Sequence, residues 1–230
     1  MHPKFLWFFI LLVSMLVGCN LASLTTAPTT IPTVAPILEF VEPTLIQSIS
    51  PTQPIINITP TSLAIQQAVI DRASQAITAL KNQDMPTLSG YVNPKLGLRF
   101  SPYASVRDTD QVFSVDKVAG LLADSTVYTW GFYDGSGAPI DLTFADYYSN
   151  FVYDADFTNA PQLELNHRLG VSTSMDNSLE FYPGAMIVEY YFPRFDPQFE
   201  GMDWRSLRLV FMEDSNIWYL VGIIHDQWTT

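Results

Sequence analysis

His225 and Asp226 are neighbours in the last apolar stretch of the chain, and their types suggest chemistry most directly. An imidazole that is oriented by a carboxylate can act as a general base, because its pKa lies near neutral pH. His167 is a second candidate base, and Asp154 and Asp156 are further candidate orienting groups. The competing interpretation is that both histidines are ordinary strand or surface residues. The sequence therefore suggests a catalytic pair without establishing one.

The sequence gives less support to a zinc site, a cysteine or serine nucleophile, or a calcium site. The chain has three histidines and one cysteine, and His2 and Cys19 belong to the N-terminal region, so we expect neither a three-histidine zinc site nor a cysteine nucleophile. No Gly-x-Ser-x-Gly nucleophile motif is present. Residues 154–159 alternate oxygen-bearing side chains like the beginning of a calcium loop, but they lack its glycine and its later glutamate. We expect no metal and no cofactor.

Arginines and aromatic residues suggest a binding pocket instead. Aromatic rings with polar tips, combined with the guanidinium group of Arg99, Arg168, Arg205 or Arg208, suit a sugar or a small organic anion. The candidate ligand-binding residues are Arg99, Trp130, Arg205, Arg208 and Asp226. The same aromatic side chains would also fill the core of a sheet, and that alternative stays open.

Two predicted strands, 205–213 and 218–228, carry three of these candidates. Ser215 and Asn216 lie between the strands and suit a two-residue hairpin turn. Such a turn predicts an ion pair at the rim of a concave sheet face, with Arg205 directly opposite Asp226. A shift of one residue would break this pair, because it would also exchange the faces of the strand.

The same register assigns the faces of the last strand. Alternation predicts that Leu220, Gly222, Ile224 and Asp226 share one face and that His225 lies on the other. Arg208 would then lie opposite Ile223. Glycine in the middle of a strand is typical of a place where a curved sheet bends.

The elements before this hairpin follow from hydrophobic periodicity. Apolar residues at helical spacing predict one amphipathic helix over 63–82, which needs a sheet to cover. Thr143 and Asp146 have the spacing of a capping box and predict a helix that continues through Phe151. The composition predicts further short helices over 85–92 and 114–122, a turn over 134–137, and strands over 97–100, 111–115, 126–132, 162–171 and 185–192.

The N-terminal region indicates where these elements operate. Lys4 precedes an apolar run over 5–17, as in a secretory signal peptide. Gly18 followed by Cys19 resembles the lipobox of bacterial lipoproteins, in which the cysteine is diacylated and the chain is cut just before it. The resemblance implies a signal peptide over 1–18 and an exported protein. Acyl chains on Cys19 would anchor it to the outer face of the bacterial cell membrane, or to an outer membrane if one is present.

Residues 19–61 differ in composition from the rest of the chain. Threonine and proline alternate there, and proline both fixes φ and removes a hydrogen-bond donor. We therefore expect a flexible, extended tether. Residues 62–230 contain no internal repeat or block of charge, and we expect them to form a single globular domain.

The charge of the chain excludes one class of partner. The formal net charge is −12, and removal of residues 1–18 takes away Lys4 and no acidic residue, which leaves −13. An acidic protein of this kind is not expected to bind nucleic acid or to adhere electrostatically to anionic lipids. Attachment to a membrane must therefore come from the acyl chains.

The order of elements over 62–230 resembles the NTF2-like, cystatin-type α+β cone. In that family an N-terminal helix packs on a strongly curved antiparallel sheet, which leaves a pocket at its open end. Segments 97–103, 143–148 and 202–211 are also similar to uncharacterised bacterial surface lipoproteins. The alternative fold is an antiparallel β-sandwich with peripheral helices.

Two functions remain open on this basis. The first is a lipid-anchored cell-envelope protein whose domain binds a small ligand or a protein partner. The alternative is an enzyme of isomerase or hydrolase type, with an Asp/His general base in the pocket of the cone, as the family resemblance permits. Related cones often pair through their sheets, so a homodimer is compatible with either function.

Overall fold

The computed structural model describes residues 60–229. The expected signal peptide over 1–18, the lipidation site Cys19 and nearly all of the tether lie outside the described residues. Among the helices of residues 60–229, none is long and apolar enough to cross a membrane.

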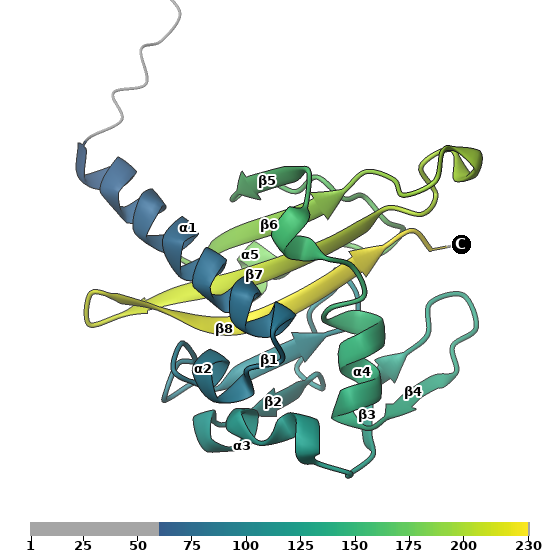
Figure 1. The fold of residues 1–230 in the computed structure, drawn as a ribbon, viewed down its shortest axis with the longest axis horizontal. Helices are drawn as coiled ribbons and strands as arrows, with labels where there is room; N and C mark the ends of the chain where they lie inside the picture. Colours follow the sequence, from purple (N-terminus) through teal and green to yellow (C-terminus); the bar gives the residue numbers. More distant parts are fainter. Residues whose placement is uncertain (1–59, 230) are drawn as a thin grey trace, which may run out of the picture. The chain divides into compact units, whose positions relative to one another are not determined.

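The described residues form a mixed α+β fold around one six-stranded sheet (Figure 1). The strand order is β2-β1-β8-β7-β6-β5, and every neighbouring pair is antiparallel except β1 and β8, which are parallel. The strands are β1 (Leu98–Ser101), β2 (Gln111–Phe113), β5 (Gln162–Leu165), β6 (Met186–Phe192), β7 (Arg205–Asp214) and β8 (Ile217–Gln227). A separate two-stranded sheet pairs β3 (Tyr128–Phe132) with β4 (Pro139–Leu142).

The helices are mostly short, with one exception. They are α1 (Pro60–Lys81), α2 (Met85–Ser89), α3 (Val115–Ala119), α4 (Phe144–Phe151) and α5 (Ser178–Phe181), with 3-10 turns at Leu121–Ala123, Phe157–Asn159 and Pro197–Phe199. The structure confirms the expected amphipathic helix, the capped helix and the long C-terminal hairpin. Their observed ends differ from the predicted ends by a few residues.

Helix α1 lies across β6, β7 and β8 and covers one face of the sheet (Figure 1). Its buried side chains recur at the spacing of a helical stripe, and Val69, Ala73 and Leu80 have no exposed surface. They pack in the main core with strand residues such as Leu209 and Phe211. Full burial of each larger side chain contributes about 1.5–3 kcal/mol, so the face toward α1 is the main source of stability.

The main core continues into an aromatic cluster under α4. Trp130 and Tyr147 stack with their ring centroids 3.9 Å apart, and Phe100 packs edge-on against both rings. Thr143 begins the helix as its N-cap, accepting a hydrogen bond from the backbone N–H of Asp146. This cap is the one that the sequence predicts.

The C-terminal hairpin contains an irregularity that corrects the predicted register. Ser215 and Asn216 do form the two-residue turn, both with positive φ. The ladder then shifts between Val210 and Phe211, because β8 contributes one extra residue at Val221. Beyond this bulge the pairs are Arg205 with Gln227, Ser206 with Asp226, and Arg208 with Ile224. The predicted pairs of Arg205 with Asp226 and of Arg208 with Ile223 are wrong.

The bulge also changes which residues share a face. Leu220 and Ile223 both belong to the main core. Val221 and Ile224 belong to a smaller core on the other face, together with Val210 and Tyr182. His225 consequently points to the face covered by α1 and α4, and Asp226 points to the opposite face.

The opposite face of the sheet is covered by the segment between β5 and β6. The sequence predicts a strand over 162–171, but β5 ends at Leu165 and the chain then crosses this face as loop and as the short α5. Asn166, with positive φ, marks the turn, and its side chain accepts a hydrogen bond from the Ile187 N–H. Helix α5 and strand β4 are elements that the sequence does not predict.

The six-stranded sheet is open and its end strands β2 and β5 do not pair with each other. The coarse expectation of an α+β fold with a mostly antiparallel sheet is confirmed, whereas a strongly curved cone is not established by this arrangement. The second sheet has only two strands within the described part of the chain, so these residues do not form the alternative sandwich of two packed sheets.

Candidate functional site

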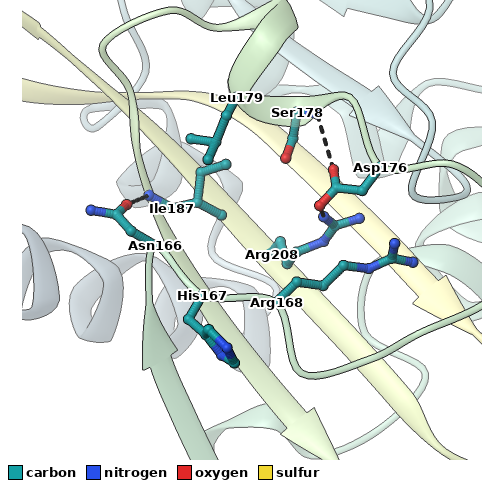
Figure 2. Close-up of a pocket in the computed structure, with 8 residues that line it drawn as sticks. All are labelled: Asn166, His167, Arg168, Asp176, Ser178, Leu179, Ile187 and Arg208. Atoms are coloured by element: carbon teal, nitrogen blue, oxygen red, sulfur yellow. Dashed lines mark hydrogen bonds and ion pairs between the residues drawn. The ribbon is translucent and has the colours of Figure 1, made fainter.

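A small cavity opens beside two arginines on the face of the sheet opposite α1, with a volume of about 90 Å³. Figure 2 shows the two arginine side chains extending in the same direction, with the guanidinium group of Arg208 meeting Asp176 and with His167 pointing away from both. The lining residues come from the loop after β5, from α5, from β6 and from β7. They are Asn166, His167, Arg168, Asp176, Ser178, Leu179, Ile187 and Arg208.

Arg208 is the unusual residue of this cavity. It is only 2% exposed, yet its Nε and Nη2 atoms have no hydrogen-bond partner within residues 60–229. The Nε atom of Arg168 is likewise buried and without a partner there. Buried donors normally have an acceptor, because an unsatisfied one costs about 1–3 kcal/mol. All three such donors belong to two residues that line the cavity, so the cavity is the candidate place for acceptors from outside the chain.

Two ion pairs hold the arginines in place. Nη1 of Arg208 lies 2.8 Å from Oδ2 of Asp176, and Nη2 of Arg168 donates to Oδ2 of Asp226 at 2.7 Å. Asp226 is completely buried, and its Oδ2 is 3.9 Å from Nη2 of Arg208. Burial raises the pKa of Asp176, but the charge of Arg208 and the hydrogen bonds from Ser178 outweigh that effect and lower it.

Glu189 attaches the covering loop to the sheet. Its side chain is 1% exposed and accepts hydrogen bonds from the backbone N–H groups of Leu169 and Gly170 and from the hydroxyl of Ser206. The loop residue Arg168 is therefore held beside the cavity by a buried carboxylate whose own hydrogen bonds are satisfied.

The charges around the cavity are close to balanced, since each guanidinium already faces a carboxylate. A small anion would gain little from this balance, but a ligand with hydroxyl groups could accept from the free guanidinium N–H groups and donate to Asp176. Leu179 and Ile187 add an apolar wall. The arrangement suits a small polyhydroxylated group.

A second polar cluster lies on the other face of the sheet, around His225. Its Nε2 is 3.2 Å from Oδ2 of Asp154, and its Nδ1 is 3.3 Å from the carbonyl oxygen of Pro102. Nε of Arg205 donates to the same oxygen of Asp154 at 2.8 Å. Phe151 packs edge-on against the imidazole, which has no exposed surface. The structure thus brings together the imidazole and one of the orienting carboxylates that the sequence singles out.

Two opposing effects set the protonation of Asp154. Burial raises its pKa, but the neighbouring His225 and Arg205 outweigh burial and lower it. Asp154 is therefore ionised at neutral pH. Neither His225 nor Asp154 lines the cavity beside Arg208.

The remaining candidates lie apart from one another. Trp130 has no exposed surface and donates from Nε1 to the carbonyl of Leu142 inside the aromatic cluster, so it belongs to the core. Arg205 lines a shallow groove with Trp228 near the end of β8. Arg99 lines a separate cavity. His167 is exposed at the rim of the cavity beside Arg208. Of the five predicted ligand-binding residues, Arg208 and Asp226 alone come together.

Residues 154–159 do not gather as a cation site. Asp156 instead accepts a hydrogen bond from Nζ of Lys81 at 2.8 Å and others from Thr158 and Asn159. No group of three or more His, Cys, Asp or Glu side chains within residues 60–229 is arranged to hold a metal ion.

Sequence reasoning names Arg168 among the arginines that could line a pocket, but it missed Asp176 and Glu189. Glu189 carries a signal that could have found it, because it is a carboxylate in the middle of a predicted apolar strand, and such a group is buried only with partners. Asp176 lies in a loop, where periodicity provides no signal of this kind.

Comparison with known proteins adds no functional assignment. No protein-family model matches the chain, and no curated protein matches it. Among solved structures, the crystal structure of a DUF4783 family protein from Bacteroides ovatus ATCC 8483 is similar at 13% sequence identity and a TM-score of 0.25, over 68% of this chain and 94% of that chain. Similarity at this level supports no conclusion about the site.

Proposed function

We propose that this protein is a lipid-anchored cell-envelope protein whose folded domain binds a small polyhydroxylated ligand, such as a terminal sugar residue, in the cavity beside Arg208. The observation that carries the proposal is the burial of Arg208, 2% exposed, with two hydrogen-bond donors that no described residue accepts from. A folded domain rarely leaves such groups unsatisfied, and a ligand hydroxyl supplies the missing acceptor.

The size of the cavity limits what can enter it. A volume of about 90 Å³ corresponds to roughly three water molecules in the liquid, at about 30 Å³ each. One edge of a sugar ring therefore fits inside, with the rest of the ligand outside, near the exposed His167 and Asn166. Ordered water in place of a ligand is the competing explanation for the free donors, and the experiment below separates the two.

The anchoring part of the proposal comes from the N-terminal sequence. The lipobox-like residues and the Thr/Pro-rich segment up to residue 61 support export, diacylation of Cys19, and a tethered domain outside the bacterial membrane. We further propose that the domain is a relative of the NTF2-like cones. The long N-terminal helix across one face and the run of antiparallel strands at the C-terminal end support this relation.

Binding can be tested on the full-length protein in maltoside micelles, with protein-free micelles as the blank. Saturation-transfer NMR would be recorded with galactose, glucose and N-acetylglucosamine, and with citrate as a small anion. Arg208→Lys keeps a positive charge opposite Asp176 but removes the Nε and Nη2 donors. We expect a sugar signal that falls at least tenfold in Arg208→Lys, because a hydrogen bond to a charged group contributes about 1.5–3 kcal/mol.

Arg194→Lys is the matched control, because Arg194 is exposed on the loop after β6. It should bind like the unaltered protein. If no sugar binds, or if Arg208→Lys binds sugars unchanged, the proposal is wrong and the cavity is a hydrated structural feature. A signal from citrate alone would assign the site to small anions.

A general-base enzyme remains the second candidate, and one observation favours it: Nε2 of His225 lies 3.2 Å from a carboxylate oxygen of Asp154. This pair would need an opening that admits a substrate, because the imidazole is completely buried. Turnover of any ester or ketone substrate that is abolished by His225→Gln, with folding retained, would establish this function in place of simple binding.

A further inference from the structure

A second cavity, separate from the one beside Arg208, lies under the outer end of the same sheet face. Its volume is about 270 Å³, slightly below the roughly 300–1,000 Å³ that is usual for small-molecule sites. It shares no lining residue with the first cavity. The lining residues are Leu96, Arg99, Val112, Phe181, Tyr182, Pro183, Met212 and Val221.

Most of the wall is apolar. Val221, the extra residue of the bulge in β8, forms part of it and is 2% exposed. Leu96 and Val112 are 53% and 42% exposed at the mouth. These two apolar side chains are partly in water beside a concave apolar surface. A ligand that covered them would remove apolar surface from water, which is favourable.

Two of the lining residues, Tyr182 and Arg99, carry polar groups. Tyr182 is 8% exposed, and its hydroxyl has no hydrogen-bond partner within residues 60–229. Burial raises the pKa of Tyr182 to about 12, although the nearby Arg99 charge opposes this effect. The hydroxyl is therefore protonated at neutral pH and is a free donor.

Arg99 is held in a fixed position beside the hydroxyl. Its Nη1 donates to the backbone carbonyls of Arg107, Asp108 and Asp110, and its guanidinium carbon lies 4.9 Å from the centre of the Phe181 ring. These contacts leave the rest of the guanidinium group for another acceptor. The carboxylate of Asp110 is occupied elsewhere, by the Ser101 hydroxyl and the Arg107 N–H.

We propose that this cavity is a binding site for a compact apolar monocarboxylate, of the size of an aryl-propionic acid. Its carboxylate accepts from the Tyr182 hydroxyl and lies against the Arg99 charge, and its apolar body packs against Val112, Met212 and Val221. The combination of one charged head and apolar walls distinguishes this site from the balanced, hydroxyl-binding cavity beside Arg208.

The test uses 3-phenylpropionate, with 3-phenylpropanol and 3-phenylpropylamine as probes of the same shape that lack the negative charge. Titrations of the full-length protein in maltoside micelles would follow the methyl signal of Met212 in ¹H–¹³C spectra, with protein-free micelles as the blank. We expect the carboxylate to bind at least tenfold more tightly than the alcohol and the amine. Equal affinity for all three probes, or no shift of the Met212 signal, would overturn the proposal.

Two variants locate the ligand. Tyr182→Phe removes only the hydroxyl and should weaken binding of the carboxylate about tenfold, while the exposed Tyr133→Phe should not change it. Val112→Glu places a negative charge at the exposed mouth and should abolish binding without disturbing the core. Binding that survives Val112→Glu would show that the ligand sits elsewhere. Arg208→Lys should leave phenylpropionate binding unchanged, so the two proposed sites can succeed or fail independently.

Discussion

Oδ2 of Asp226 accepts a hydrogen bond from Nη2 of Arg168 at 2.7 Å, and this contact joins the central strand β8 to the loop that covers it. The carboxylate of Asp226 is completely buried, whereas the Arg168 side chain is 21% exposed. The pair therefore holds the loop against the sheet, and water cannot reach the carboxylate end of the pair.

Replacing Asp226 by Asn should lower the free energy of unfolding by about 3 kcal/mol, because it leaves the guanidinium of Arg168 without its counter-charge in a mostly buried place. Urea denaturation at neutral pH measures the loss. Asp108→Asn, at an exposed carboxylate, is the control and should change stability by less than about 0.5 kcal/mol. Equal stability of both variants would mean that the ion pair adds nothing to the fold.

Asp154 should make the protein less stable in acid. Its pKa is lowered from the ordinary value of 3.8, because His225 and Arg205 together outweigh burial, which acts to raise it. A carboxyl group whose pKa is lower in the folded state stabilises the fold above its unfolded pKa, and the contribution is lost as the pH falls through the folded pKa. The difference in unfolding free energy between the unaltered protein and Asp154→Asn should thus be constant from pH 7 to about pH 5 and shrink below about pH 4.

Urea denaturation at a series of pH values gives this difference curve. Other aspartates also titrate in acid, so the curve for Asp108→Asn is needed as a reference and should show no such decline. A difference that grows as the pH falls would contradict the assigned direction of the Asp154 shift.

Gly170 should not tolerate a side chain. A Cβ atom added there would lie 2.5 Å from Cζ3 of Trp204, far inside contact distance, and the Trp204 side chain is buried. Gly170→Ala is therefore expected to cost about 1–3 kcal/mol and to shift the tryptophan fluorescence as the indole moves. Gly120→Ala is the control, because nothing lies within 4 Å of a Cβ atom added at Gly120. Gly137→Ala is unsuitable, because the positive φ of Gly137 would itself strain an alanine. Similar stability of the two alanine variants would contradict the close packing of Trp204.

Trp130 should affect stability and leave binding unchanged. Trp130→Phe removes the hydrogen bond to the Leu142 carbonyl and part of the stack on Tyr147, and we expect a loss of about 2 kcal/mol. Binding of sugars or phenylpropionate by the folded fraction should be unchanged. Trp228→Phe, at a side chain that is 42% exposed, should be nearly neutral. If the folded Trp130→Phe variant bound either ligand more weakly, Trp130 would belong to the ligand site after all.

Local patterns predict much of the scaffold, because they act over a few residues. The stripe of Val69, Ala73 and Leu80 predicts α1, and the Thr143 cap predicts the beginning of α4. The Ser215-Asn216 turn also forms as expected. Each of these features depends on the conformation of neighbouring residues and on little else.

The candidate site could not be predicted in the same way. One extra residue at Val221 shifts the register of β8, so that Asp226 pairs with Ser206 and no longer lies directly opposite Arg205. Gly222, beside the extra residue, signals an irregular strand, but it does not show that a residue is inserted or how the register shifts. Arg168 reaches Asp226 across 58 positions of sequence, and only the path of a covering loop determines that contact.

The position of β8 in the sheet sets the order in which this domain can be completed. β8 pairs with β1 on one side and β7 on the other, so it joins the two parts of the sheet although it is the last of the described strands along the chain. The carbonyl of Pro102 and the ring of His225 meet across 123 positions. During synthesis, β1 therefore has no neighbour on its inner side until residue 227 has left the ribosome. Such long-range pairing slows folding, because the six-stranded sheet cannot be completed before its last described strand is available.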